Sequence, residues 1–564
     1  MRRVFVGAAA AAAVLVVAAV AVAQIFSGVP NANPRSGSPP NVVANGFALQ
    51  RVVNGNDTLE NPAGIFSRYG YLDDSTLQTP PDAQPTKTEP DQNTYLVTHH
   101  SPGGPTAGYD YGHRFLIQGH EVFSATLNRA YFTRINLDVS DPAHRITLLN
   151  PLPADATDSG VRSIDGSTYD PFTGQLLFTA EAGAAGGVFG QALKWSGTTA
   201  PPVANYDGSM GKAGYEGIHN DKLGNLMIVE DVGGAGVTDN GAATLVKQPN
   251  SFVYRFKPTH AGDLTQGKFQ VLQVLVNGTP IVFHDGATLG QQAARDDALG
   301  DPIKALHSGQ SLQAKWVTIH DTAVDGTAAF DANAAAKAGG VGANANAANK
   351  GTPLKRPENG KFVPGTDFRS FVIAETGDTN KTAGDYPGAA ERAAWGALLR
   401  VDLPKAGADA GTIKAVVVGD QAHASFDNVT FLDKRTVLLS EDRGETLHQQ
   451  ANALDSLWSF DITRPLDQIN ADAKRMIAQG RDPEATGDVG LKEPAPPKPL
   501  THNDGDNEVT GIHVSDGSTS PSGILGAQLP FNAGSGHSPW RIFVTGQHGA
   551  NITYEIVATR KNHG

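Results

Sequence analysis

The chain has 564 residues, of which 40% are apolar and 18% are charged, so it can bury one large core or two ordinary ones and is too apolar to be disordered. Its formal net charge of −13, without any basic stripe, argues against nucleic acid as a partner. No cysteine is present, which excludes disulfides, a thiolate nucleophile and zinc sites with cysteine ligands.

The N-terminus carries the features of an export signal. Arg2 and Arg3 precede an uncharged run rich in Ala and Val at 4–23, which closes with an A-x-A cleavage motif. The letters RRVFV also resemble the core of a twin-arginine signal. We expect residues 1–23 to be cleaved, which leaves a periplasmic or extracellular protein with no membrane contact. The alternative is an uncleaved anchor, because the run is about long enough to span a bilayer.

Residues 24–44 are predicted to be a flexible leader, since Ser, Pro, Asn and Gly dominate them. Beyond them, short apolar runs rich in β-branched or aromatic residues alternate with turn signals, and each run is too short for a core helix. Examples of these predicted strands are 114–118, 176–179, 225–229, 371–374, 436–439 and 541–545. The pattern predicts an all-β fold in a single domain over 45–564.

Several of these predicted strands end in a carboxylate, and a second acidic residue lies upstream of each. The pairs are Asp165 with Glu181, Glu216 with Glu230 and Asp231, Glu358 with Glu375 and Asp378, Asp427 with Glu441 and Asp442, and a degenerate copy with Glu508 before Gln547 and His548. Each repeat consists of a strand, a Gly or Asn turn and a second strand that ends in an acid. Such repetition along a chain is typical of propeller blades, which present side chains to one axial face. A further copy near Glu121 would give six blades. The alternative is a set of unrelated surface turns, in which Asp, Glu and Gly are also common.

Two segments interrupt the repeats. Residues 324–352 have low complexity and are predicted to be a solvated insertion, while 465–505 combine a helical pattern at 469–480 with the Pro-rich letters EPAPPKP. We expect both to lie outside the propeller and to carry no chemistry.

The acids that converge on one axial face would repel one another unless cations neutralise them, and oxygen ligands favour hard ions, calcium above all. Arg356 stands among them beside Glu358. Its planar guanidinium matches a pair of phosphate oxygens, which makes it a candidate phosphate-binding group. The alternative is an ordinary salt bridge to a neighbouring acid.

In order along most of the chain, several segments resemble the PhoX-type alkaline phosphatases. They are GHE, STYDPFTGQLLFTAE, YEGIHNDKLGNLMIVEDVGG, PNSFVYRF, LKRPENGKF with ETGDT, DNVTFL with SEDRG, LHQQANALDS, and NDGDNEVTGIHVSDG with TGQHGAN. The resemblance implies a six-bladed propeller that holds calcium and iron at one end and hydrolyses phosphomonoesters there.

The resemblance also implies roles for particular residues. It makes Glu181, Glu216 and Glu358 the leading metal ligands, with Glu508 and Asp231 as weaker candidates. Arg356 would bind the phosphoryl group, and Asn428 would assist from the next blade.

One position departs from the family. Its characterised enzymes carry an iron-ligating cysteine just before the acid that matches Glu181, and here that residue is Ala180. Several segments, PENGKF among them, are more similar to an uncharacterised branch. The resemblance therefore implies calcium and leaves iron open.

The sequence thus predicts an exported, calcium-dependent phosphomonoesterase that works as a monomer on a small phosphate ester. Two alternatives stay open. One is another metal-dependent propeller hydrolase of the lactonase type, which would need a His or Asn/Asp cluster around one calcium. The other is a binding propeller without catalysis, in which calcium only stabilises the fold.

Overall fold

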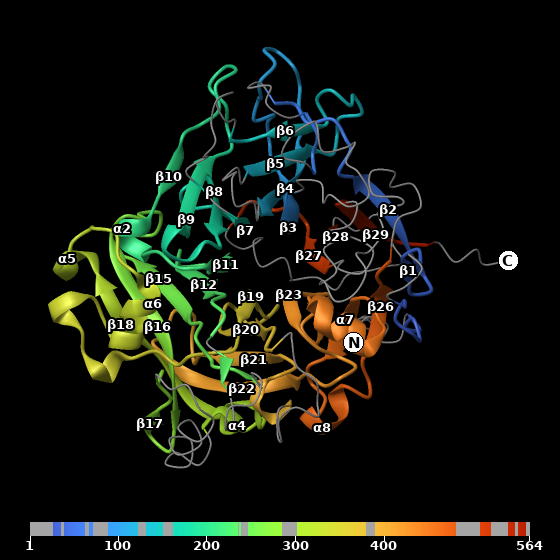
Figure 1. The fold of residues 1–564 in the computed structure, drawn as a ribbon. Coiled ribbons are helices and arrows are strands. Elements are labelled where there is room, and N and C mark those ends of the chain that lie inside the picture. The colour runs from blue at the N-terminus through green and yellow to red at the C-terminus, as the bar shows by residue number, and fades with distance from the viewer. Residues whose placement is uncertain are drawn as a thin grey trace, which may run out of the picture.

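The structure is a computed structural model, and the part of the chain that it describes is shown in Figure 1. The described residues are 26–34, 39–61, 67–70, 88–121, 131–150, 161, 163–234, 236–237, 246–284, 302–378, 390–480, 508–520, 540–547 and 551–559. The predicted signal peptide at 1–23 lies outside them. Within this part of the chain, none of the helices has the length and hydropathy needed to cross a bilayer.

Antiparallel sheets dominate the molecule, and three of them have four strands each. They are β3 (Glu89–Val97), β4 (Arg114–Glu121), β5 (Tyr131–Asn136) and β6 (Ile146–Leu148); β7 (Ile164–Asp170), β8 (Gln175–Ala180), β9 (Gly187–Ala192) and β10 (Val203–Asn205); and β27 (Glu508–Ser515), β28 (Arg541–Gln547) and β29 (Ile552–Ala558) with β2 (Phe47–Val53) at the edge. A five-stranded sheet contains β23 (Phe426–Phe431), β24 (Thr436–Glu441), β25 (Ser456–Asp461), β26 (Lys474–Ala478) and β1 (Val42–Val43).

A larger sheet of ten strands joins two groups of four. The first group is β11 (Tyr215–Asn220), β12 (Leu226–Glu230), β15 (Val253–Pro258) and β16 (Gly267–Val276), with β17 (Thr279–Pro280) beside β16; the second is β19 (Pro357–Phe362), β20 (Ser370–Glu375), β21 (Ala397–Asp402) and β22 (Ala410–Val418). The long strand β18 (Leu312–Asp321) pairs with both β16 and β22 and so links the groups. A small ribbon of β13 (Gly236–Val237) and β14 (Val246–Lys247) stands apart.

The helices are short and lie between strands. They are α2 (Asp207–Met210), α4 (Pro302–His307), α5 (Thr322–Asp325), α6 (Ala332–Ala338), α7 (Gly444–Ala451) and α8 (Leu466–Ile469), with 3₁₀ turns at Gly183–Ala185, Gly342–Asn344, Ala347–Asn349 and Ala390–Arg392. The predicted all-β class is therefore confirmed.

Six strands, which we call the first strands, gather at the middle of the molecule (Figure 1). They are β3, β7, β11, β19, β23 and β27. Each contacts the next in that order, and β27 contacts β3, so the contacts form a closed cycle. The number of blades stays a prediction at this point, because β18 merges two of the strand groups into one sheet.

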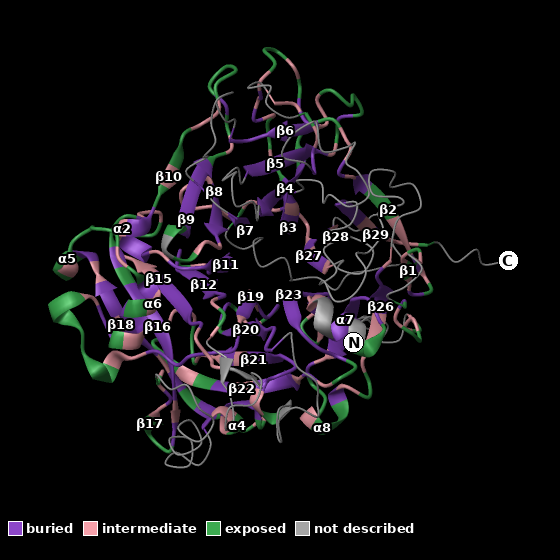
Figure 2. Ribbon diagram, in the orientation of Figure 1, coloured by how far each residue is buried: buried purple, intermediate pink, exposed green. Residues whose placement is uncertain are grey.

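The core lies between successive sheets, and the strands of the interior are buried while exposure is confined to outer loops and edges (Figure 2). Phe132 of β5 packs on Phe178 of β8, with ring centroids 4.4 Å apart, and such contacts recur around the molecule. Burying one side chain of this size contributes about 1.5–3 kcal/mol. These contacts fix the angles between sheets and so the positions of the first strands.

The N-terminal segment closes the structure. Strand β2 pairs with β29, so the sheet that contains the C-terminal strands also takes a strand from near the start. Part of the predicted flexible leader is packed as well: the Val29 amide donates to the Arg475 carbonyl (2.8 Å), and the rings of Phe26 and Phe47 lie 5.6 Å apart.

Both predicted insertions contain regular structure. In 324–352, α6 begins after Asp331, whose side chain accepts from the Ala334 amide (2.8 Å), and Ala335 and Ala336 on one face enter the core. Small side chains let this helix approach the sheet, which composition alone did not indicate. The predicted helix at 469–480 is wrong: after α8 the chain forms β26, because pairing with β25 outweighs the local helical pattern.

Candidate functional site

Five of the first strands carry a carboxylate at a β-bulge near their beginning. The five residues are Asp91, Asp165, Glu216, Glu358 and Asp427, each located where the pairing register shifts. A bulge places two residues opposite one and re-aims their side chains. The sixth strand, β27, has its bulge after Thr510 and contributes Glu508 from its first position.

Glycine next to two of these acids allows neighbouring first strands to approach closely. A Cβ atom at Gly166 would lie 2.0 Å from the Glu216 carbonyl oxygen, and one at Gly217 would lie 2.9 Å from Asn359 Oδ1. Because real Cβ atoms do not come that close, a side chain at Gly166 would push β7 and β11 apart. The glycines of the sequence repeats, predicted as turns, lie within β7 and β11 at their bulges and set the distance between carboxylates.

The carboxylates form one continuous cluster. In each of four sets, ligand oxygen atoms of three acids lie within 4.8 Å of one another. The sets are Asp91–Glu121–Asp165, Asp165–Glu181–Glu216, Glu216–Glu358–Asp427 and Asp91–Asp427–Glu508. They share members, so the eight acids are connected, and we call them the carboxylate cluster. The structure thus brings together Glu181, Glu216, Glu358 and Glu508.

Burial and mutual repulsion perturb the acids of this cluster. Loss of solvent is the main cause and neighbouring carboxylates add to it, so the pKa values of Glu121, Asp165, Glu216, Glu358 and Asp427 are raised well above their ordinary range. Burial, with repulsion from Asp231, likewise raises the pKa of Glu181 to about 8. Without added cations, several of these groups would hold protons at neutral pH.

Some oxygen atoms of the cluster are buried without a hydrogen-bond partner. Among the described residues these are Glu121 Oε1, Asp165 Oδ1 and Asp427 Oδ2. A buried carboxylate oxygen that nothing contacts is costly, and a cation between such oxygens removes the cost. The donors are all carboxylates, which suits hard ions such as calcium. The residues therefore fit a calcium centre.

Arg356 lies at the edge of the cluster and pairs with two acids. Its Nε atom donates to Asp231 Oδ2 (2.9 Å), and its Nη2 atom contacts Glu358 Oε1 (2.8 Å) and Asp231 Oδ2 (2.8 Å). Burial opposes its charge, but Asp231 and Glu358 outweigh burial and raise the guanidinium pKa well above its ordinary value. The salt bridge considered as the alternative role of Arg356 is thus present.

Two features leave Arg356 able to bind a ligand as well. Its Nη1 atom has no partner among the described residues, and 19% of its side chain is exposed. Its backbone has φ of 49°, a left-handed conformation that is unusual for a residue with a side chain and recurs at functional sites. Asp231 therefore orients Arg356, and its own oxygens are engaged in doing so.

Asn428 belongs to the other half of the cluster. Its Nδ2 atom donates to Asp427 Oδ1 (2.6 Å), Thr510 Oγ1 (3.1 Å) and Asp91 Oδ1 (3.3 Å). Asn428 therefore bridges β23, β27 and β3 and helps to fix two of the acids.

Asp91, Glu121, Asp165 and Asp427 are not among the ligands predicted from the sequence, although the last three belong to its repeats. The signal for Asp165 and Asp427 was the Gly or Asn that follows each of them. Asp91 gave no such signal, since Gln92 follows it.

Conversely, three acids of the repeats hold the sheets together instead of joining the cluster. Glu230 accepts from the Phe252 amide (3.0 Å) and the Tyr254 hydroxyl (2.8 Å). Glu375 accepts from the Lys355 amide and pairs with His307, and Glu441 accepts from the Ala424 amide and pairs with Arg443.

No protein-family model and no curated protein matches the chain. Among solved structures, PhoX of Pseudomonas fluorescens in complex with vanadate, a transition state analogue, is similar at 11% identity and a TM-score of 0.48, covering 96% of this chain and 98% of that one. Sqt1 of Chaetomium thermophilum, bound to the N-terminus of the ribosomal protein L10, gives 10% identity and a TM-score of 0.30, with 83% and 97% covered. The PQQ-bound aldose sugar dehydrogenase of Streptomyces coelicolor has 12% identity and a TM-score of 0.23, covering 67% of this chain and 99% of that one. At these TM-scores and identities, the likeness assigns neither a family nor an activity to this chain.

Proposed function

We propose that this chain is an exported, monomeric phosphatase that hydrolyses phosphomonoesters at calcium ions held by the carboxylate cluster. The observation that carries the proposal is the cluster itself: three of its buried oxygens have no partner among the described residues, and Arg356 lies at its edge with an Nη1 group that none of those residues contacts. Export rests on the sequence of residues 1–23 alone.

The proposed architecture is a six-bladed β-propeller. It is supported by the closed cycle of contacts among the six first strands and by the bulge that recurs in each of them. In this interpretation the ten-stranded sheet is two adjacent blades, and β18 is an outer strand that bridges them. A propeller presents the beginnings of its first strands at one end of its axis, where the cluster lies.

Calcium is proposed to bind where the sets of three acids meet. Glu181, Glu216 and Glu358 would be ligands together with Asp165 and Asp427, and Glu508 would act with Asp91. Asp231 would serve chiefly by orienting Arg356, since both of its oxygens contact that guanidinium. Bound calcium would neutralise the acids, lower the pKa of a bound water and offset charge on the transferring phosphoryl group.

The substrate phosphoryl group is proposed to contact Arg356. Its Nε and Nη2 atoms are held by Asp231 and Glu358, so the Nη1 group is fixed in direction and can donate to a phosphoryl oxygen. A donor that is oriented before the reaction stabilises charge that develops during the reaction. Iron is not part of the proposal, because Ala180 offers no thiolate and the described members of the cluster are all carboxylates.

One observation favours a second candidate. Asn428, with Asp91, Asp427 and Glu508, makes an Asn/Asp/Glu set of the kind that a lactonase-like hydrolase would place around a single calcium. A binding propeller stabilised by calcium would need the same carboxylates and no substrate contact by Arg356.

Turnover assays separate the three functions. The purified protein would be incubated with a nitrophenyl phosphomonoester, the corresponding diester and a lactone, in the presence of calcium and of a chelator. Phosphomonoester hydrolysis that chelator abolishes and calcium restores supports the proposal. Lactone hydrolysis alone would support the second candidate, and calcium-dependent stability without turnover would indicate a binding protein.

A matched pair of variants tests the location of the site. Glu216→Gln removes the charge of an acid that two sets share, and Glu391→Gln removes the charge of an exposed acid that pairs with Lys304. Only the first should abolish turnover. Equal turnover in both variants would exclude the cluster as the active site.

A further inference from the structure

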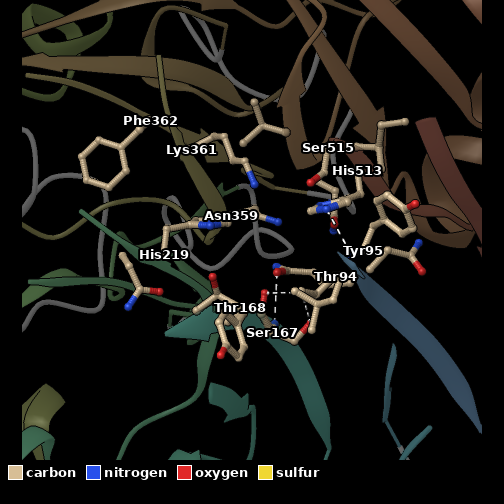
Figure 3. A pocket seen from close by; sticks show the side chains of 18 of the residues that line it. Thr94, Tyr95, Ser167, Thr168, His219, Asn359, Lys361, Phe362, His513 and Ser515 are labelled. Carbon is tan, nitrogen blue, oxygen red and sulfur yellow. Dashed lines mark hydrogen bonds between the residues drawn. The ribbon is translucent and has the colours of Figure 1, made fainter. Parts of the chain in front are cut away.

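A pocket lies beyond the bulges, on the side away from the carboxylate cluster. It is lined by the next residues of the six first strands, such as Thr94, Ser167, His219, Asn359, Lys361 and His513. Figure 3 shows these side chains gathered around one space, with residues from β3, β7, β11, β19 and β27 facing it. None of these residues belongs to the carboxylate cluster.

The charge of this pocket is opposite to that of the cluster. Lys361 is partly buried and its Nζ atom has no partner among the described residues, and no Asp or Glu is among the described residues that line the pocket. Burial lowers the pKa of Lys361 to about 8, and no carboxylate acts to raise it. At neutral pH the pocket thus contains an ammonium group without a counter-ion from its own lining.

The two histidines have defined tautomers, which follow from their hydrogen bonds. The Tyr95 amide donates to His513 Nε2 (3.2 Å), so the proton of the neutral ring is on Nδ1. Asn359 Oδ1 accepts from the Gly360 amide (2.7 Å) and lies 3.2 Å from His219 Nε2, so that nitrogen carries the proton. Burial, together with the charge of Lys361, lowers the pKa of both rings well below the ordinary value.

These tautomers leave particular groups available to a ligand. His513 Nδ1–H is a donor with no partner among the described residues, and the Lys361 ammonium group offers three more N–H donors. The unprotonated Nδ1 of His219 can accept a hydrogen bond from an ammonium or hydroxyl group.

We propose that this pocket is a second binding site, for a small oxyanion such as a phosphate or a carboxylate, with Lys361 as its counter-charge and His513 as a neutral donor. The site is distinct from the carboxylate cluster and requires no metal, so the inference does not rest on the proposed function. It accounts for a Lys that has no acidic partner in the described part of the chain and lies among polar side chains, which a purely structural role does not.

The pH dependence of anion binding tests the role of Lys361. The titratable groups that face it are His219 on β11, His513 on β27, Tyr95 on β3 and Tyr169 on β7, while β23 contributes none among its lining residues. Burial raises the pKa of both tyrosines above 10, and the histidines are neutral, so Lys361 is the group that changes charge near pH 8. Sulfate is the probe of choice, because it does not titrate between pH 7 and 10.

Calorimetric titration of the calcium-loaded protein with sulfate should show binding at pH 7 that weakens about tenfold for each pH unit above 8. Lys361→Met should weaken it at pH 7 at least tenfold, and Lys361→Arg should retain it and remove the pH dependence. Lys414→Met, on β22 outside the pocket, should bind as the unaltered protein does.

Phosphate and acetate would then be compared, and preference for one of them identifies the oxyanion class. Equal sulfate binding by the Lys361→Met variant, binding that does not change between pH 7 and 10, or no binding of any of the three anions would overturn the proposal. Turnover with the phosphomonoester is a separate readout, so loss of anion binding with intact turnover leaves the proposed function standing.

Discussion

Removing calcium should make the stability of this protein fall as the pH rises from 5 to 8. The pKa of Glu181 is raised from 4.5 to about 8 in the folded state, and the pKa values of five other acids of the cluster are raised as well. A group with a raised folded-state pKa binds a proton more tightly when folded. The stability that it contributes is complete below about pH 4.5 and is lost as the pH passes through its folded-state pKa.

The size of the effect follows from the shift of Glu181. Each pKa unit corresponds to about 1.4 kcal/mol, so a rise from 4.5 to about 8 represents roughly 5 kcal/mol for this one group. With an unfolding entropy of about 2.1 cal/mol/K for each of the 564 residues, 5 kcal/mol lowers the melting temperature by about 4 °C. The other acids with raised pKa values make this fall in melting temperature larger.

Thermal melts of chelated protein at pH 5, 6, 7 and 8 measure how the melting temperature changes with pH. The same melts with calcium measure how far calcium reverses the decrease. Calcium at a thousand times its dissociation constant adds about 4 kcal/mol to the folded state, and more at high pH, where the acids are ionised. Glu181→Gln should reduce the slope of the chelated protein, whereas Glu391→Gln should not. A melting temperature of chelated protein that is constant or rises from pH 5 to 8 would refute the electrostatic account of the cluster.

Three further predictions concern the same site. Arg356→Lys keeps the charge but loses the planar group held by Asp231, so turnover should fall about a hundredfold or more with little change in melting temperature. Near-normal turnover of this variant would mean that Arg356 is only a structural cation. Glu216→Gln should lower the number of calcium ions bound in a calorimetric titration, and an unchanged stoichiometry would remove Glu216 from the ligands. Elemental analysis of protein purified without added metal should find calcium and little iron, and stoichiometric iron would require a nitrogen or oxygen ligand in place of the missing thiolate.

The all-β class was predictable because short apolar runs separated by turn residues have one common explanation. The convergence of Glu216 and Glu358 was predictable for a related reason: each stands in a repeat before a Gly or Asn, and similar repeats place similar residues at similar positions around an axis. The low-complexity segment could not be predicted in the same way. Its alanines form a buried face in α6 only because the neighbouring sheet leaves room for a helix of small residues.

The sequence could not show which of two adjacent acids reaches the site, and the reason is geometric. Glu230 is the last residue of β12 and Asp231 follows it, and successive residues of an extended chain point to opposite sides. One of them must therefore face the core and the other the axis. Glu230 is the one in the core, where the Phe252 amide and the Tyr254 hydroxyl donate to it, and Asp231 contacts Arg356; these partners are distant in sequence.

The same bulges explain how one strand can contribute to two sites of opposite charge. Glu358 and Lys361 are three residues apart on β19, a separation of about 10 Å at about 3.3 Å per residue, and in a regular strand they would point to opposite faces. The register shift between Pro357 and Asn359 adds one residue to this strand, so the alternation is reset and both side chains face the axis. On β11 the shift between Tyr215 and Ile218 does the same for Glu216 and His219. The bulges therefore divide the axial surface into an acidic end and a pocket whose ammonium group has no acidic partner among the described residues, and they keep Lys361 far enough from Glu358 that the two form no ion pair.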